Sequence, residues 1–114
     1  MMDTMKWIAT LLASLAVLTH AGAAMSAGDA AAGAAKAKEV CQACHGMDGN
    51  SATPDYPKIG GQYPDYLSKA LRDYKSGARK NAIMAGFAGT LSAPDIDNVA
   101  AYYASQPAVV ATKH

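Results

Sequence analysis

One hexapeptide, Cys41-Gln42-Ala43-Cys44-His45-Gly46, constrains this chain more than any other stretch of its 114 residues. Two cysteines at this spacing, with a histidine directly after the second, form the attachment signature of a c-type haem. Each thiol can add to a vinyl group of the porphyrin and form a thioether, and the imidazole can reach the iron from the same side. Since one helical turn brings positions i, i+3 and i+4 onto one face, we expect both sulfurs and the imidazole to face one ligand.

Three other uses of the cysteine pair remain open. A thioredoxin-like dithiol has the same spacing but follows a β-strand, and no β-rich run precedes Cys41. A structural zinc site needs four protein ligands, whereas this chain has only two cysteines and no paired histidines. A plain disulfide would leave His45 without a role. Haem attachment is the interpretation that uses all three residues.

The first 27 residues have the pattern of a secretory signal peptide. A lysine precedes the apolar run Trp7–Leu18, and small residues follow it. The run is shorter than the roughly 20 apolar residues that span a bilayer. We expect cleavage after Ala23 or Ala27, and residues 28–114 form the exported haem domain in either case. An uncleaved leader, the alternative, would hold the protein at the membrane.

Composition narrows the possible compartment and partners. The formal net charge is only +1, so bulk charge predicts no nucleic-acid partner. Haem attachment uses both cysteines, which leaves none for a disulfide in an oxidising compartment. Because the motif implies haem attachment at the outer face of the bacterial inner membrane, we expect a periplasmic protein. A domain this small cannot build a large core alone, and haem would supply the centre of that core.

Two stretches early in the exported domain predict helices. The first is Asp29–Val40, which is rich in alanine but contains Gly33. Glycine costs about 1 kcal/mol in a helix interior, so Gly33 indicates another element passing close by. Pro64 and Gly77 bracket the second helix, residues 65–76. Its apolar stripe comprises Tyr66, Leu67, Ala70, Leu71 and Tyr74.

A third helix is predicted near the end of the chain. It begins at Ser92-Ala93-Pro94-Asp95, where Ser92 can cap the helix and Asp95 takes the return position of a capping box. It ends near Gln106-Pro107, because the residue before a proline is disfavoured in helical conformation. The residues expected to be buried on this helix are Ile96, Val99, Ala100 and Tyr103.

Two loops are expected between these helices. Residues 46–64 are dense in glycine and proline, and we expect this long loop to cover the histidine side of the haem. Pro57 has a fixed backbone, which suits its carbonyl to accept the Nδ1 hydrogen of His45. Ile59 could pack on the porphyrin, although ordinary turn and core roles remain open for both. The second expected loop spans residues 79–91, with apolar residues anchored in the core at Ile83, Phe87 and Leu91.

The second loop carries the candidate for the other axial position of the iron. His20 lies in the signal peptide, His114 in the C-terminal tail, and Met47 is too close to His45 to reach the opposite face. Met84 is the one methionine of the exported domain that lies far enough from His45 along the chain to reach the opposite face of the haem. A thioether opposite an imidazole favours ferrous iron and raises the reduction potential. The alternative is a core methionine beside a five-coordinate haem.

Positive charge gathers on and just after the second predicted helix. These side chains lie off the apolar stripe, so they form either a solvated helix face or a docking patch for an acidic redox partner. The residues are Lys69, Arg72, Lys75, Arg79 and Lys80.

Several segments together resemble one family, the class I cytochromes c, and in detail the small periplasmic cytochrome c-553 type of bacteria. The resemblance runs from Ala30 to Gln106 and implies an all-α fold: a small helical bundle around one covalent haem. It also implies that the first and last helices cross at Gly33 and the Tyr102/Tyr103 pair, and that Gln62 and Arg79 contact the haem propionates. The segments that carry it are Cys41–Gly46, Tyr56-Pro57-Lys58-Ile59-Gly60-Gly61-Gln62, Tyr66-Leu67, Gly77-Ala78-Arg79, Met84 and Asp95-Ile96 through Ala101-Tyr102-Tyr103.

The sequence therefore predicts a periplasmic one-electron carrier with no substrate turnover of its own. Cys41 and Cys44 would form the haem thioethers, and His45 and Met84 would bind the iron. One alternative is a haem subunit held permanently in a dehydrogenase or oxidase complex. Another is a peroxidase or gas sensor, which needs a polar group at an open iron site that the small residues beside Met84 do not offer.

Overall fold

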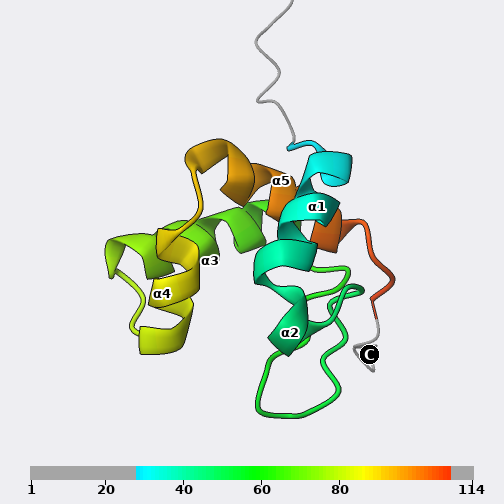
Figure 1. Ribbon diagram of the computed structural model, residues 1–114, viewed down its shortest axis with the longest axis horizontal. Coiled ribbons are helices and arrows are strands. Elements are labelled where there is room, and N and C mark those ends of the chain that lie inside the picture. Colours follow the sequence, from blue (N-terminus) through cyan, green and yellow to red (C-terminus); the bar gives the residue numbers. More distant parts are fainter. Residues whose placement is uncertain (1–27, 109–114) are drawn as a thin grey trace, which may run out of the picture.

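The computed structural model of the protein describes residues 28–108, which form five α-helices (Figure 1). No residue between 28 and 108 lies in a β-strand, and the predicted all-α fold is confirmed. The predicted signal peptide and its cleavage point lie outside the described residues. The helices are α1 (Ala30–Val40), α2 (Gln42–His45), α3 (Pro64–Ser76), α4 (Ala82–Gly89) and α5 (Ala93–Ala104).

The first and last helices cross at Gly33, as expected. The Asp29 side chain caps α1 by accepting hydrogen bonds from the backbone N–H groups of Ala31 and Ala32. At the crossing, a Cβ on Gly33 would lie only 1.9 Å from the carbonyl oxygen of Asn98 in α5. The Asn98 side chain in turn accepts a hydrogen bond from the Asp29 N–H at 2.8 Å. The missing side chain at Gly33 is therefore what allows the two backbones to touch.

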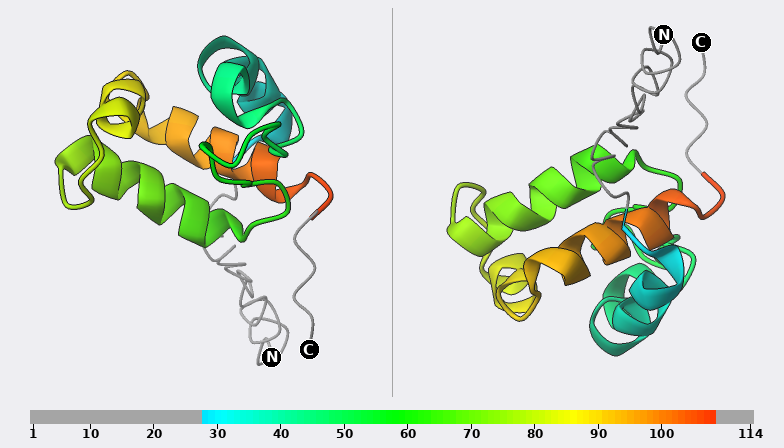
Figure 2. Two further views of the ribbon diagram at one scale, coloured as in Figure 1. Left: turned by 90° about the horizontal axis from the view of Figure 1, so that it is seen from below. Right: turned by 90° about the horizontal axis from the view of Figure 1, so that it is seen from above.

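Helix α5 lies between α1 and α3 and contributes most of the core (Figure 2). All four residues of its predicted stripe are buried, with exposed fractions of 1 to 3%. The capping box between Ser92 and Asp95 is present in both directions. The helix ends at Ala104, slightly before the predicted Gln106-Pro107. The core cluster joins residues of α5 to one residue each from α1 and α3; its members are Ala37, Leu67, Val99, Ala100 and Tyr103.

Helix α3 begins and ends as predicted, with Pro64 at its first position and Gly77 after its last turn in the left-handed conformation, φ 85°. Of its apolar stripe, Leu67 is buried, whereas Tyr66 is 51% exposed. The stripe is wider than the core contact because Tyr66 lies at the open edge of the helix pair. Figure 2 shows α3 running alongside α5.

The predicted loop over residues 79–91 is wrong, because Ala82–Gly89 forms α4. Asn81 caps this helix: its Oδ1 accepts a hydrogen bond from the Met84 N–H at 3.0 Å. Two glycines in eight residues lower the local helix propensity by about 1 kcal/mol each, which explains the error. Packing of α4 against α3 provides the stabilisation that the local sequence lacks.

The expected apolar anchors of this region are only partly confirmed. Leu91 is buried, with an exposed fraction of 2%. Ile83 and Phe87, by contrast, are 63% and 43% exposed. A helix of eight residues has room for one buried face, and in α4 Ala88 occupies it. Ile83 and Phe87 instead line a cavity between α4 and the α1–α2 arm.

The long segment between α2 and α3 contains no helix, as predicted. It folds back on itself where the carbonyl of Gly49 accepts hydrogen bonds from the N–H groups of Ile59 and Gly60, at 2.8 and 3.1 Å. Farther along, the Gly61 N–H donates to the carbonyl of Tyr103 at 2.9 Å and ties the segment to the end of α5. The segment therefore returns to the core on either side of an exposed bend.

Candidate cofactor site

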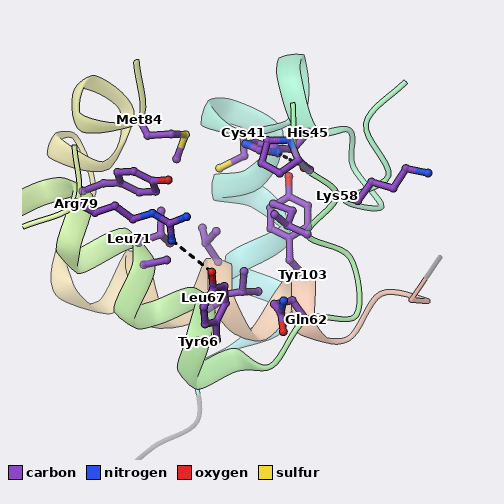
Figure 3. A pocket seen from close by; sticks show the side chains of 16 residues that line it. Cys41, His45, Lys58, Gln62, Tyr66, Leu67, Leu71, Arg79, Met84 and Tyr103 are labelled. Carbon is purple, nitrogen blue, oxygen red and sulfur yellow. Dashed lines mark hydrogen bonds between the residues drawn. The ribbon is translucent and has the colours of Figure 1, made fainter. Parts of the chain in front are cut away.

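An apolar cavity of about 200 Å³ lies between the α1–α2 arm and the α3–α4 pair (Figure 3). A second cavity of about 140 Å³ shares part of its lining, including His45 and Met84, so the two are parts of one crevice. Every predicted site residue lines one or both of these cavities. These residues are Cys41, Cys44, His45, Pro57, Ile59, Gln62, Arg79 and Met84.

The imidazole of His45 enters the crevice from the single turn of α2. The turn closes through a hydrogen bond from the His45 N–H to the Cys41 carbonyl at 3.1 Å, and the side chain of His45 is buried. Its Nδ1 lies 2.9 Å from the carbonyl oxygen of Pro57. Because a carbonyl can only accept, Nδ1 donates, so a neutral imidazole keeps on Nε2 a lone pair that can bind a metal. The predicted Pro57 hydrogen bond is confirmed.

Two tyrosines of α5 hold the backbone that follows this histidine. The Tyr103 hydroxyl donates to the carbonyl of Gly46 at 2.9 Å, and the Tyr102 hydroxyl donates to that of Met47 at 2.5 Å. Burial raises the pKa of the Tyr103 phenol, so it stays protonated as a donor. The sequence placed these tyrosines at the helix crossing but carried no local signal for their bonds, because donor and acceptor are far apart along the chain.

The two cysteines lie at the same edge of the crevice and are partly buried. Burial raises the pKa of the Cys41 thiol to about 11. A thioredoxin-like dithiol needs a lowered pKa instead, so this environment argues against that use of the pair. Among residues 28–108, no three or more histidine, cysteine, aspartate or glutamate side chains gather into a possible metal site. The zinc interpretation therefore lacks a complete set of ligands in this part of the chain.

Met84 reaches the crevice from the first turn of α4, and Figure 3 shows it on the side opposite His45. A nitrogen and a thioether sulfur on opposite walls supply only two ligands to a metal. A cofactor that fits this crevice must therefore have a flat apolar body and must itself supply the other atoms that bind the metal. The apolar walls contributed by Leu67, Leu71 and Val99 suit such a body, so the residues present fit a haem.

Arg79 and Gln62 lie at the rim of the crevice. The Arg79 guanidinium donates to the Tyr66 hydroxyl at 3.4 Å and stands 4.9 Å from the centre of the Tyr74 ring. The bond to Tyr66 raises the pKa of Arg79 above its ordinary value, so it stays charged. Two aromatic contacts hold the charge in place. Lys58 lines the same cavity, although no local sequence pattern selects it.

Three of the five cations expected to form a patch have partners within the protein. Lys69 pairs with Asp73 at 2.5 Å, and Arg72 pairs with Asp97 of α5 at 2.8 Å. Lys75 donates to the carbonyl of Leu91. Within residues 28–108, no carboxylate forms an ion pair with Lys75, Arg79 or Lys80. The unneutralised charge therefore lies toward the end of α3 and the segment after it.

Comparison with known proteins agrees with this geometry. A family model described as "Cytochrome C oxidase, cbb3-type, subunit III" matches residues 28–102. The chain belongs to the class I cytochrome c family. Membership confirms the predicted cofactor, a covalent haem c, and it confirms the resemblance on which the fold prediction depended.

Relatives and a solved structure show how far the similarity extends. Cytochrome c4 of Pseudomonas aeruginosa is 50% identical over 84% of this chain and 47% of its own length. Cytochrome c-554(548) of Halomonas halodenitrificans is 47% identical over 70% of this chain and 99% of its own length. The structure of reduced cytochrome c4 from Pseudomonas stutzeri matches with a TM-score of 0.66 and 46% identity, over 71% of this chain and 47% of that one.

The chain thus spans about half the length of the cytochromes c4 that it matches. A further relative, from Thiomonas intermedia, is named a thiosulfate dehydrogenase electron acceptor and is 42% identical over 55% of this chain and 30% of its own length. Within the described part of the chain, no helix has the length and apolar character needed to cross a membrane.

Proposed function

We propose that this protein is a one-electron carrier that turns over no substrate of its own. Cys41 and Cys44 would hold one haem c through thioether bonds, and His45 and Met84 would bind its iron. The haem, when bound, supplies an iron that accepts and releases one electron. The observation that carries the proposal is the placement of the His45 imidazole, with Nε2 free, across an apolar crevice from the thioether of Met84.

The protein's own residues act by orienting the ligands and excluding water. The Pro57 carbonyl fixes the imidazole ring through Nδ1, and Ile59 with the core side chains keeps the crevice apolar. With a ligand from each wall, no position is left for a substrate. An arrangement that rearranges little between two charge states suits a carrier better than an open-site peroxidase or sensor, which needs a polar group beside Met84.

At the rim, Arg79 and Gln62 are proposed to donate to the haem propionates. Arg79 is already oriented by Tyr66 and Tyr74, so it can hold a carboxylate with little loss of side-chain freedom. The side-chain carbonyl of Gln62 accepts from the Tyr63 N–H at 2.9 Å, which leaves its NH₂ group free to donate.

Partner docking and export complete the proposal. Residues 1–27 act as the secretory signal, and the domain from residue 28 works in the periplasm. An acidic redox partner docks on the cations of α3 and the following segment. Lys75 and Lys80 contribute most to docking, because Asp73 and Asp97 neutralise Lys69 and Arg72 and the haem propionates engage Arg79. The relative named a thiosulfate dehydrogenase electron acceptor supports the partner class, a redox enzyme.

A paired substitution tests the axial assignment. In protein matured with haem, Met84→Ala should abolish the weak red absorption that ferric haem iron shows when bound to a thioether. Met47→Ala is the control, since Met47 lines neither cavity and should keep the band. Retention of the band in Met84→Ala would exclude Met84 as the ligand. Pigment that acidified organic solvent extracts from the unaltered protein would exclude the thioether bonds.

A further inference from the structure

The carbonyl that orients His45 lies in a segment with little backbone support of its own. Between residues 50 and 58, no backbone-to-backbone hydrogen bond is made by the described structure, and residues 52–58 are all exposed. Within that span Ser51 is the one buried residue, with an exposed fraction of 7%. The orientation of Pro57 therefore depends on the hydrogen bonds that the Ser51 side chain makes within this segment.

Ser51 holds the peptide immediately before the critical carbonyl. Its Oγ lies 2.5 Å from the carbonyl oxygen of Tyr56 and 3.1 Å from that of Thr53. A hydroxyl has a single hydrogen, and the nearer Tyr56 oxygen is its better acceptor. This oxygen belongs to the Tyr56–Pro57 peptide, whose atoms are coplanar. Fixing it therefore fixes the nitrogen of Pro57, and the proline ring restricts the rotation that remains.

The Tyr56–Pro57 unit meets the histidine at two points. The Pro57 carbonyl accepts from Nδ1 of His45 at 2.9 Å. The Tyr56 ring also approaches the imidazole edge-on, with ring centres 6.5 Å apart and planes inclined by 62°. Both contacts come from one dipeptide, so its placement determines the orientation of the imidazole ring.

We propose that Ser51 is a positioning residue for the axial imidazole, acting through the Tyr56–Pro57 peptide on the hydrogen bond to His45 Nδ1. A strong hydrogen bond at Nδ1 makes the imidazole a better electron donor, which favours the oxidised iron. The Ser51 hydroxyl thereby lowers the reduction potential. This inference rests on the proposed axial role of His45.

Ser51→Ala in the haem-loaded protein is the direct test. Its loss of one hydrogen bond should shift the equilibrium between ferric and ferrous protein about fivefold toward ferrous. That factor is a rise of about 40 mV, given 59 mV per tenfold change for one electron. In ferrous protein, the Nδ1 hydrogen of His45 should also exchange with solvent faster, as followed by NMR. Ser51→Thr, which keeps the hydroxyl, should restore both quantities toward the unaltered protein.

Ser76→Ala is the matched control. Ser76 is an exposed residue at the end of α3 that donates to the Asp73 carbonyl, so its substitution should change neither quantity. If Ser51→Ala does not fold, Ser51→Cys replaces it, since a thiol is a much weaker donor of nearly the same shape. An unchanged potential and exchange rate in the folded variant would overturn the proposal. Haem must stay covalently bound in every variant, so pigment extractable from the unaltered protein signals failure of the proposed function instead.

Discussion

Gly33 of α1 packs directly on the backbone carbonyl of Asn98 in α5. A Cβ on Gly33 would lie 1.9 Å from that oxygen and 2.9 Å from the Cβ of Tyr102. This contact sets the separation of the two helices. It also places Tyr103 within reach of the carbonyl of Gly46, so the helix crossing determines where the residues after the cysteine motif can lie.

Gly33→Ala should lower the free energy of unfolding by about 3 kcal/mol, because backbone atoms of α5 must move to admit the methyl group. Gly86→Ala is the matched control, since no atom lies within 4 Å of a Cβ at Gly86. It should stabilise α4 by about 0.5–1 kcal/mol through helix propensity. Denaturant unfolding of the two haem-loaded variants measures both changes in free energy. Equal changes would contradict the close contact between Gly33 and α5.

Tyr103→Phe should lower the free energy of unfolding at neutral pH by about 1–2 kcal/mol, because the Gly46 carbonyl loses its donor in a buried site. Tyr63→Phe should leave it unchanged, since the Tyr63 side chain is 78% exposed. Thermal or denaturant unfolding distinguishes the two. Equal stabilities would show that the hydroxyl bond of Tyr103 contributes nothing.

The same tyrosine predicts the alkaline behaviour of the protein. Burial raises the pKa of Tyr103 in the folded state, whereas an unfolded tyrosine titrates near 10. Above pH 10 the unfolded chain therefore releases a proton that the folded protein keeps, and stability must fall as the pH rises. In Tyr103→Phe this part of the decline should disappear. A parallel decline in both proteins between pH 9 and 11 would contradict it.

Asn81→Ala should weaken the start of α4, because the Asn81 side chain accepts the Met84 N–H. Loss of such a cap costs about 1 kcal/mol. If Met84 is the ligand, the red thioether band should disappear at a lower temperature on heating, while remaining present in the cold. Asn81→Asp, which keeps a capping oxygen, should behave like the unaltered protein. An unchanged melting temperature of the band in Asn81→Ala would show that the cap does not support the ligand.

Asp97→Asn should reduce stability at neutral pH and not in acid. The hydrogen bond from Arg72, followed by that from Ser68, lowers the pKa of the Asp97 carboxyl in the folded state. Its contribution is therefore present above the unfolded value of about 3.9 and is lost as the pH falls through the lower folded pKa. Because the side chain is 40% exposed, we expect less than about 1 kcal/mol.

Unfolding of Asp97→Asn between pH 2 and 7 measures this effect, with the exposed loop residue Asp55 substituted by Asn as control. A difference from the unaltered protein that persists below pH 2.5 would show that the carboxylate charge is not what joins α3 to α5.

Local signals were sufficient for the elements that have them. Haem attachment follows from three residues within one turn around Cys41 and His45, and α3 follows from Pro64 and Gly77 at its ends. Gly33 predicted a close neighbour because a glycine inside an alanine-rich helix needs a steric reason. The Pro57 carbonyl could be assigned to His45 because proline fixes its own backbone and lies in the segment that directly follows His45.

Tertiary structure alone decided what depends on contacts between distant segments. Helix α4 contains two glycines and becomes a helix only against α3, so Met84 lies on a helix rather than a loop. The pairing of Arg72 with Asp97, and of the Tyr103 hydroxyl with the Gly46 carbonyl, joins residues that no local pattern connects. Propensities and caps act over a few residues, whereas such pairings exist only once the helices have packed.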